Sequence, residues 1–93
     1  MTDAREYIEA EAMKVIKRYK RHKNAYCIYW KSVYGSAERG RRIYIDEMTR
    51  RIIDKAIKVF GELMATADGY VTPYTHLLAE QTYDLLTAGI YIE

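Results

Sequence analysis

The sequence predicts an all-α protein of three helices, because apolar residues recur at helical spacing in three stretches and helix-breaking residues separate them. These stretches cover about 3–34, 45–68 and 73–88. Of the 93 residues, 49% are hydrophobic and 30% charged, a composition typical of a folded domain. We therefore expect a single helical domain over 1–93, with a long amphipathic N-terminal helix and two shorter helices.

The first helix is expected over about 3–34. Thr2 suits the N-cap, and Asp3 and Glu6 place negative charge in the first turn, where the helix dipole favours it. A heptad-like apolar seam then continues at spacings of four and three through Ile8, Ala12, Val15, Tyr19, His22, Tyr26, Tyr29 and Val33. Residues 24–29 are the least favourable to a continuous helix, because Tyr, Cys and Ile prefer β structure and Asn can end a helix.

The second helix is expected over about 45–68. Its apolar face consists of Ile45, Met48, Ile52, Ile53, Ala56, Val59, Phe60, Leu63 and Ala67. The opposite face carries opposite charges four residues apart, such as Glu47 and Arg51, as solvated helices do. Gly69 suits the left-handed position after the end near Asp68. No element is assigned to residues 35–44, which begin with the interrupting pair Gly35 and Ser36.

The third helix is expected over about 73–88. Thr72 followed by Pro73 reads as an N-cap and a first helical residue. The residues expected to be buried are Tyr74, Leu77, Leu78, Gln81 and Leu85. Gly89 is expected to end the helix, with Ile90 and Ile92 folding back onto the core.

The charges are sorted along the chain. Residues 12–37 carry seven Lys and Arg and no acid, whereas residues 59–93 carry five acids and no Lys or Arg. Aromatic residues interleave the basic stretch, a combination found on nucleic-acid-binding and protein-binding surfaces. The predicted nucleic-acid contacts are Lys14, Lys17, Arg18, Lys20, Arg21, Lys23, Arg39, Arg41 and Arg42. A solvated, solubilising helix face explains the same charges equally well.

These patterns favour a small, non-enzymatic, nucleic-acid-associated regulatory or accessory protein that binds DNA or RNA with weak sequence preference. The alternative is a protein-binding adaptor, inhibitor or assembly subunit that acts through the aromatic seam. The interface residues of that alternative are Tyr19, His22, Tyr26, Tyr29, Trp30 and Val33. A helix of about 32 residues would extend about 48 Å, beyond the other two, so its exposed aromatic end favours a homo-oligomer.

No enzymatic, cofactor or metal site is expected. His76, Glu80 and Asp84 share one helix face, but a solvated polar face is the commoner reason for such spacing. Residues 35–42 have the glycine spacing of a phosphate-binding loop, yet Arg41 and Arg42 replace its Lys and Ser or Thr.

The sequence also gives an expectation for location. The acidic start of the chain does not resemble a secretory signal, and the longest apolar run, 25–30, is too short to span a membrane. The single cysteine, Cys27, fits a reducing compartment. We expect a cytoplasmic protein with no membrane partner.

Overall fold

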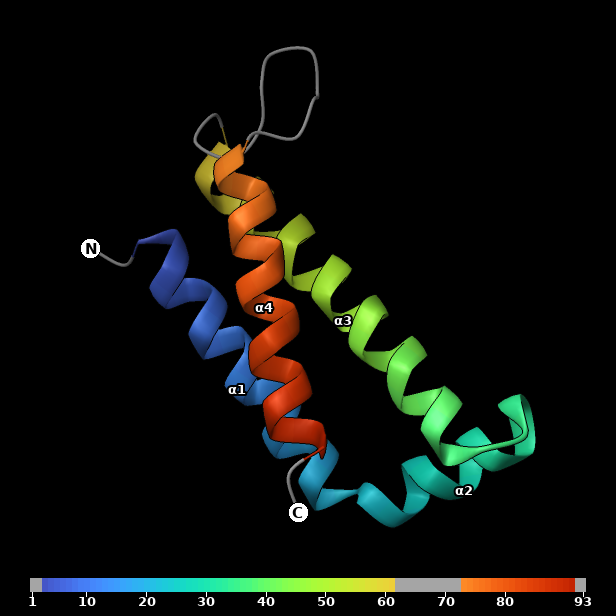
Figure 1. The fold of residues 1–93 in the computed structure, drawn as a ribbon. Coiled ribbons are helices and arrows are strands. Elements are labelled where there is room, and N and C mark those ends of the chain that lie inside the picture. The colour runs from blue at the N-terminus through green and yellow to red at the C-terminus, as the bar shows by residue number, and fades with distance from the viewer. Residues whose placement is uncertain (1–2, 62–72, 92–93) are drawn as a thin grey trace.

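The structure is a computed structural model that describes residues 3–61 and 73–91, and these residues form four α-helices (Figure 1). The helices are α1 (Ala4–Arg21), α2 (Lys23–Tyr34), α3 (Ala37–Phe60) and α4 (Pro73–Tyr91). No strand occurs in these two ranges. The predicted all-α class is confirmed, and the predicted number of three helices is wrong.

The expected N-terminal helix is divided at His22, not within residues 24–29. His22 leaves the helical conformation at φ −119° and ψ 26°, although its N–H still donates to the carbonyl oxygens of Arg18 and Tyr19 at 3.2 Å each. α2 therefore turns away from α1 and meets the beginning of α3 (Figure 1). The cap of α1 also differs from the prediction, because the Asp3 carboxylate accepts the Glu6 N–H at 2.8 Å, while Thr2 lies outside the described residues.

The turn at His22 covers aromatic area that a straight helix would leave exposed. Trp30 stacks on Tyr19 of α1 with ring centroids 5.8 Å apart and contacts Tyr44 of α3 at 5.4 Å. Trp30 is only 3% exposed, so the expected exposed aromatic surface does not include it.

α3 begins earlier than predicted and includes most of the segment that had no assignment. Gly35 ends α2 in the left-handed conformation at φ 86°, and the Ser36 hydroxyl caps α3 by accepting the Arg39 N–H at 3.1 Å. α3 ends at Phe60, ahead of the predicted end. Asp68 and Gly69, the expected end and cap, lie outside the described residues.

α4 buries a different face from the predicted one. Its buried residues are Thr75, Leu78, Thr82, Leu86 and Ile90. Of the residues predicted to be buried, only Leu78 is, whereas Leu77 is 52% exposed and Tyr74 and Leu85 are also exposed. The Thr82 hydroxyl donates to the Leu78 carbonyl oxygen at 2.7 Å, so this polar side chain is buried with its hydrogen bond made.

The predicted end of α4 is wrong as well. Gly89 lies inside the helix, where its missing Cβ leaves room for the Ile16 side chain of α1. Ile90 is therefore buried as a helical residue instead of folding back, while Thr72 and Ile92 lie outside the described residues.

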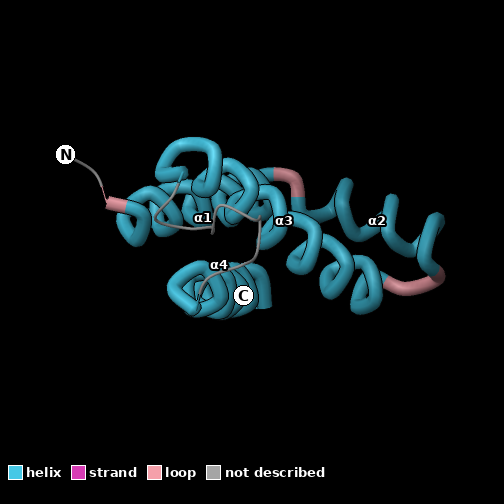
Figure 2. Tube along the Cα trace, turned by 90° about the horizontal axis from the view of Figure 1, so that it is seen from above, coloured by secondary structure: helices cyan, strands magenta, loops and turns pink. Residues whose placement is uncertain are grey.

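The helices form two layers. α4 lies on one face of the pair formed by α1 and α3, and α2 extends this pair sideways (Figure 2). The core between the layers contains Ile8, Ala12, Ile16, Ile45, Ile52, Ala56, Leu78, Leu86 and Ile90. None of the four helices has an apolar stretch long enough to cross a bilayer. The face of α1 and α3 opposite α4 is left open by the described helices (Figure 2).

Candidate nucleic-acid interface

The sides of α3 are fixed by its contact with α4. Asp46, Arg50, Ile53 and their neighbours share a groove with Ala79 of α4, so this side of α3 faces α4. Arg51 is two residues from Ile53, about 200° around the helix, and Lys55 lies one turn beyond Arg51. Arg51 and Lys55 therefore lie on the open face.

The contact of α1 with α4 likewise fixes the side on which the cations of α1 lie. Arg5, Ile8 and Glu9 line a groove with residues of α4. Arg18 follows Glu9 by nine residues, which is about 180° around the helix. Lys14, four residues before Arg18, and Arg21, three residues after it, share its side of α1.

The charges of cations from both helices act on Tyr44. Burial raises the pKa of Tyr44 above its ordinary value and the Tyr26 hydroxyl adds to this, whereas the charges of Arg18 and Arg51 lower it. Arg18 of α1 and Arg51 of α3 therefore act on one phenol from separate helices. We call the surface they share the basic face, which consists of Lys14, Arg18 and Arg21 of α1 and Arg51 and Lys55 of α3.

Two acidic side chains lie beside the basic face, and each is paired. Glu11 is 3.8 Å from the Lys14 amine, and Glu47 is 2.7 Å from the Arg51 guanidinium. Such surface pairs contribute little energy and leave both cations accessible. Arg18, Arg21 and Lys55 are exposed and form no ion pair with any residue that the structure describes. The basic face therefore keeps a positive balance.

Of the other predicted contacts, Arg41 has a structural position. Its Nε donates to the Tyr19 hydroxyl at 3.3 Å, which raises the pKa of Arg41, and its guanidinium lies 5.9 Å from the ring centroid of Tyr91. A second guanidinium nitrogen contacts the sulfur of Cys27 at 3.9 Å. Arg41 therefore joins α1, α2 and α4 to α3 and is not free to contact a phosphate.

The remaining predicted cations lie outside the basic face or at its edge. Arg42 is exposed, pairs with Glu38 at 3.5 Å and lies nine residues before Arg51, about 180° around α3. Arg39 is exposed on that distant side too. Lys17 lies at the edge of the basic face, whereas Lys20 and Lys23 lie with His22 around the corner between α1 and α2. Of the nine predicted contacts, the basic face thus includes three, Lys14, Arg18 and Arg21, with Lys17 at its edge.

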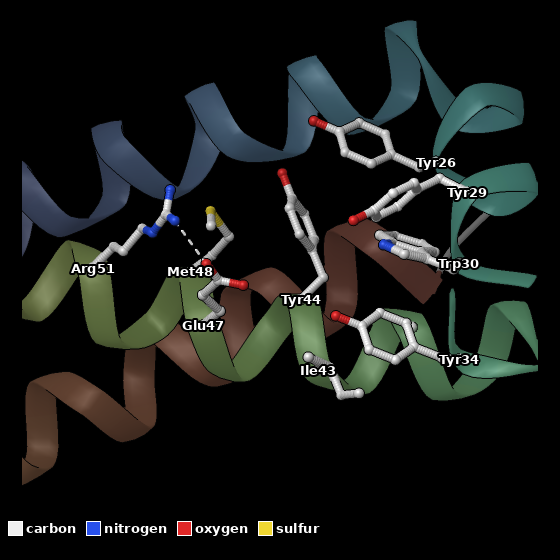
Figure 3. Close-up of a pocket in the computed structure, with 10 residues that line it drawn as sticks. Tyr26, Tyr29, Trp30, Tyr34, Ile43, Tyr44, Glu47, Met48 and Arg51 are labelled. Carbon is white, nitrogen blue, oxygen red and sulfur yellow. Dashed lines mark hydrogen bonds and ion pairs between the residues drawn. The ribbon is translucent and has the colours of Figure 1, made fainter. Parts of the chain in front are cut away.

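A pocket adjoins the basic face between α2 and α3 (Figure 3). Its volume is about 260 Å³, and five aromatic side chains line it: Tyr26, Tyr29, Trp30, Tyr34 and Tyr44. The Tyr44 ring centroid is 5.2 Å from that of Tyr26 and 5.4 Å from that of Trp30. Arg51 also lines this aromatic pocket and thereby connects it to the basic face.

The predicted interface residues are divided among three environments. Tyr19 and Trp30 are buried within the chain's own core. Tyr26 is half-buried in the aromatic pocket. Tyr29, which also lines the pocket, is exposed, as are His22 and Val33.

Sequence reasoning missed three contributors: Tyr44, Arg51 and Lys55. Tyr44 fell in the unassigned segment, and Arg51 was attributed to a solvated face because of its pairing with Glu47. That pairing is confirmed at 2.7 Å. Arg51 and Lys55 are four residues apart and therefore lie on one helix face. This spacing could have indicated a cationic stripe on α3.

The other polar cluster of the sequence forms a simple surface pair. His76 Nε2 lies 3.7 Å from Glu80 Oε1, with both side chains exposed. Across residues 3–61 and 73–91, no three His, Cys, Asp or Glu side chains are grouped to hold a metal ion.

No protein-family model, curated protein or solved structure matches the chain.

Proposed function

We propose that this protein is a small, non-enzymatic, nucleic-acid-associated regulatory or accessory protein that binds the phosphate backbone of DNA or RNA through the basic face. The observation that carries the proposal is that exposed cations of two helices, Arg18 of α1 and Arg51 of α3, lie on the side of the molecule away from α4, and Arg51 lines the same pocket as Tyr44. Phosphate contacts from such cations release counterions and carry no base information, so the sequence preference is weak.

The arrangement of charge in the fold supports this proposal. α4 has no Lys or Arg, and its acids Glu80 and Asp84 belong to the layer opposite the basic face (Figure 2). A polyanion approaching the basic face is therefore kept from the acidic helix by the thickness of the molecule. A helix without Lys or Arg thus lies on the other side of the molecule from the basic face, which favours the approach of a polyanion to the basic face.

A matched pair of charge reversals tests the proposal. Arg18→Glu with Arg51→Glu changes the basic face, and Arg39→Glu with Arg42→Glu makes the same charge change elsewhere. Fluorescence anisotropy of labelled DNA and RNA in low salt should show at least a tenfold loss of affinity for the first variant only. Equal losses would attribute binding to net charge, and absence of wild-type binding at about 10 µM would refute the proposal.

A second candidate is self-association, favoured by the apolar surface of α4. Leu77, Leu85 and Tyr74 are exposed on that helix, and Leu85 lines a groove of about 300 Å³ between α4 and α1. Arg5 lines the same groove as Glu9 and Asp84. A twofold pairing of this surface can bring the cation of one copy to the acids of the other.

Light scattering on a size-exclusion column distinguishes this candidate from a monomer. If α4 pairs with a second copy, Leu77→Glu should lower the measured mass of the assembly and leave the helical circular dichroism unchanged. His76→Glu, which places the same charge at an exposed polar neighbour of Leu77, is the control and should not change the mass. A wild-type monomer at high micromolar concentration would exclude the pairing.

A further inference from the structure

The aromatic pocket differs chemically from a core cluster because polar groups accompany its rings. In Figure 3 the hydroxyls of Tyr26 and Tyr29, together with the indole nitrogen of Trp30, point from α2 toward the side where α3 presents Tyr44. The Tyr29 side chain is 58% exposed, so one wall is accessible from outside. Tyr29 thus offers an aromatic face for stacking and a hydroxyl for hydrogen bonds at the accessible side of the pocket.

Charge at the pocket wall restricts the class of ligand. Aromatic cages attract ammonium groups through the electron-rich faces of their rings, and a neighbouring cation opposes that attraction. Here Arg51 lines the wall and holds the one acid of the pocket, Glu47, at 2.7 Å. A cationic ligand would meet the guanidinium, whereas a phosphate attached to a flat ring would be attracted by it and by nearby Arg18.

The size of the pocket also favours a single flat ring as its ligand. Its volume of about 260 Å³ lies just below the range of about 300–1,000 Å³ that drug-sized ligands occupy. One flat heteroaromatic ring fits this description better than a folded peptide segment or an extended cofactor.

We propose that the aromatic pocket takes one unstacked nucleobase of a single strand while Arg51 and Arg18 contact the adjacent phosphates. This inference rests on the proposed function and adds a selectivity to it. A base within a duplex is paired and stacked and cannot enter the pocket without being extruded, so the protein prefers single-stranded DNA or RNA. The preference among the bases is weak, because every base has a face that stacks on an aromatic ring.

The test compares three ligands of similar charge by anisotropy: a short single strand, the same strand with its bases replaced by abasic sites, and a duplex of half the length, which carries about the same number of phosphates. The base-containing strand should bind between about 5-fold and 100-fold more tightly than the abasic strand. It should also change the fluorescence of Trp30, the only tryptophan of the chain and part of the pocket wall.

Substitutions assign this difference to the pocket. Tyr29→Ala removes an exposed ring and should lower affinity for the base-containing strand without altering affinity for the abasic strand. Tyr29→Phe keeps the ring and should retain most of the affinity. Tyr83→Ala removes an exposed ring on α4, outside the pocket, and should change neither.

The outcomes separate the inference from the function on which it rests. Equal binding of the base-containing and abasic strands would overturn the base pocket and leave the basic face as a backbone-binding surface. Equal losses for both strands in Tyr29→Ala would also overturn it, because the ring would then have only a structural role. Absence of binding to all three ligands would refute the proposed function and this inference together.

Discussion

Trp30 packs its indole directly against Gly40, at a point where a Cβ on Gly40 would overlap the Trp30 side chain. The missing side chain lets α2 and α3 approach closely at this position. Because Trp30 also stacks on Tyr19, with an interplanar angle of 13°, this one contact connects three helices. The contact between Trp30 and Gly40 also forms one wall of the aromatic pocket.

Gly40→Ala should destabilise the protein. Alanine is ordinarily more stable than glycine inside a helix by about 0.5–1 kcal/mol. Here the added methyl group would displace the Trp30 indole, and overpacking of this kind costs about 1–3 kcal/mol. Urea denaturation measures the change, and Trp30 fluorescence reports displacement of the indole. A variant more stable than wild type would contradict the contact.

Two adjacent leucines test which face of α4 is buried. Leu78 is 1% exposed and Leu77 is 52% exposed. Leu78→Ala should therefore cost about 2–5 kcal/mol of unfolding free energy, whereas Leu77→Ala should change it by less than about 0.5 kcal/mol. Chemical denaturation of the two variants gives both values. Similar costs for both would show that α4 is rotated from the position described here.

Which face of α4 is buried could not be predicted from the sequence. The largest apolar side chains predicted one buried face, but the structure buries the face with Thr75, Thr82 and Gly89. Small residues allow closer helix packing, and the Thr82 hydrogen bond to the Leu78 carbonyl removes the cost of burying a hydroxyl. The spacing of apolar residues along one helix does not reveal how closely its neighbours approach. Nor does it reveal which group accepts a hydrogen bond from a hydroxyl.

The N-terminal half shows a second limit. Helical spacing in the sequence was sufficient to predict helix on both sides of His22, but no proline or glycine marks the bend. The bend follows from tertiary contacts, chiefly those of Trp30 with Tyr19 and Gly40. Three of the nine predicted basic contacts, Lys14, Arg18 and Arg21, share one side of α1, which their helical spacing was sufficient to indicate. The contribution of α3 to the same face depends on how α1 and α3 pack, which the spacing does not contain.

Arg41 and Arg42 are neighbours with different expected roles. Arg41→Gln removes the hydrogen bond to the Tyr19 hydroxyl and should lower the unfolding free energy by about 1–3 kcal/mol. Arg42→Gln removes an exposed pair with Glu38 and should change it by less than about 0.5 kcal/mol. Thermal and urea unfolding compare the two. Equal effects would contradict the structural role of Arg41.

Stability should fall in strong alkali. Burial is the largest cause that raises the pKa of Tyr7, Tyr44 and Tyr91 above the ordinary value of 10.0, and Glu11 and Glu38 add to it at Tyr7 and Tyr91. Well below pH 10.0 these phenols are protonated in both the folded and the unfolded chain and do not affect the unfolding free energy. Above it the unfolded chain loses the protons first, so the unfolding free energy declines as pH rises toward the raised values.

Tyr44→Phe is the matched variant for this effect. Because phenylalanine does not ionise, the decline above pH 10.0 should be shallower than in wild type. Urea midpoints measured on either side of that pH give the two slopes. Identical slopes would show that Tyr44 ionises equally readily in the folded and unfolded chains.

The salt dependence of nucleic-acid binding tests the basic face most directly. For wild type, the logarithm of the association constant should fall linearly with the logarithm of salt concentration, by about 0.7–0.9 for each phosphate neutralised. Replacing both Arg18 and Arg51 with Gln should reduce the steepness of this slope by the amount expected for roughly two phosphates. Replacing both Arg39 and Arg42 with Gln should leave the slope unchanged. An unchanged slope in the first variant, or equal reductions in both, would contradict a binding site formed by α1 and α3 together.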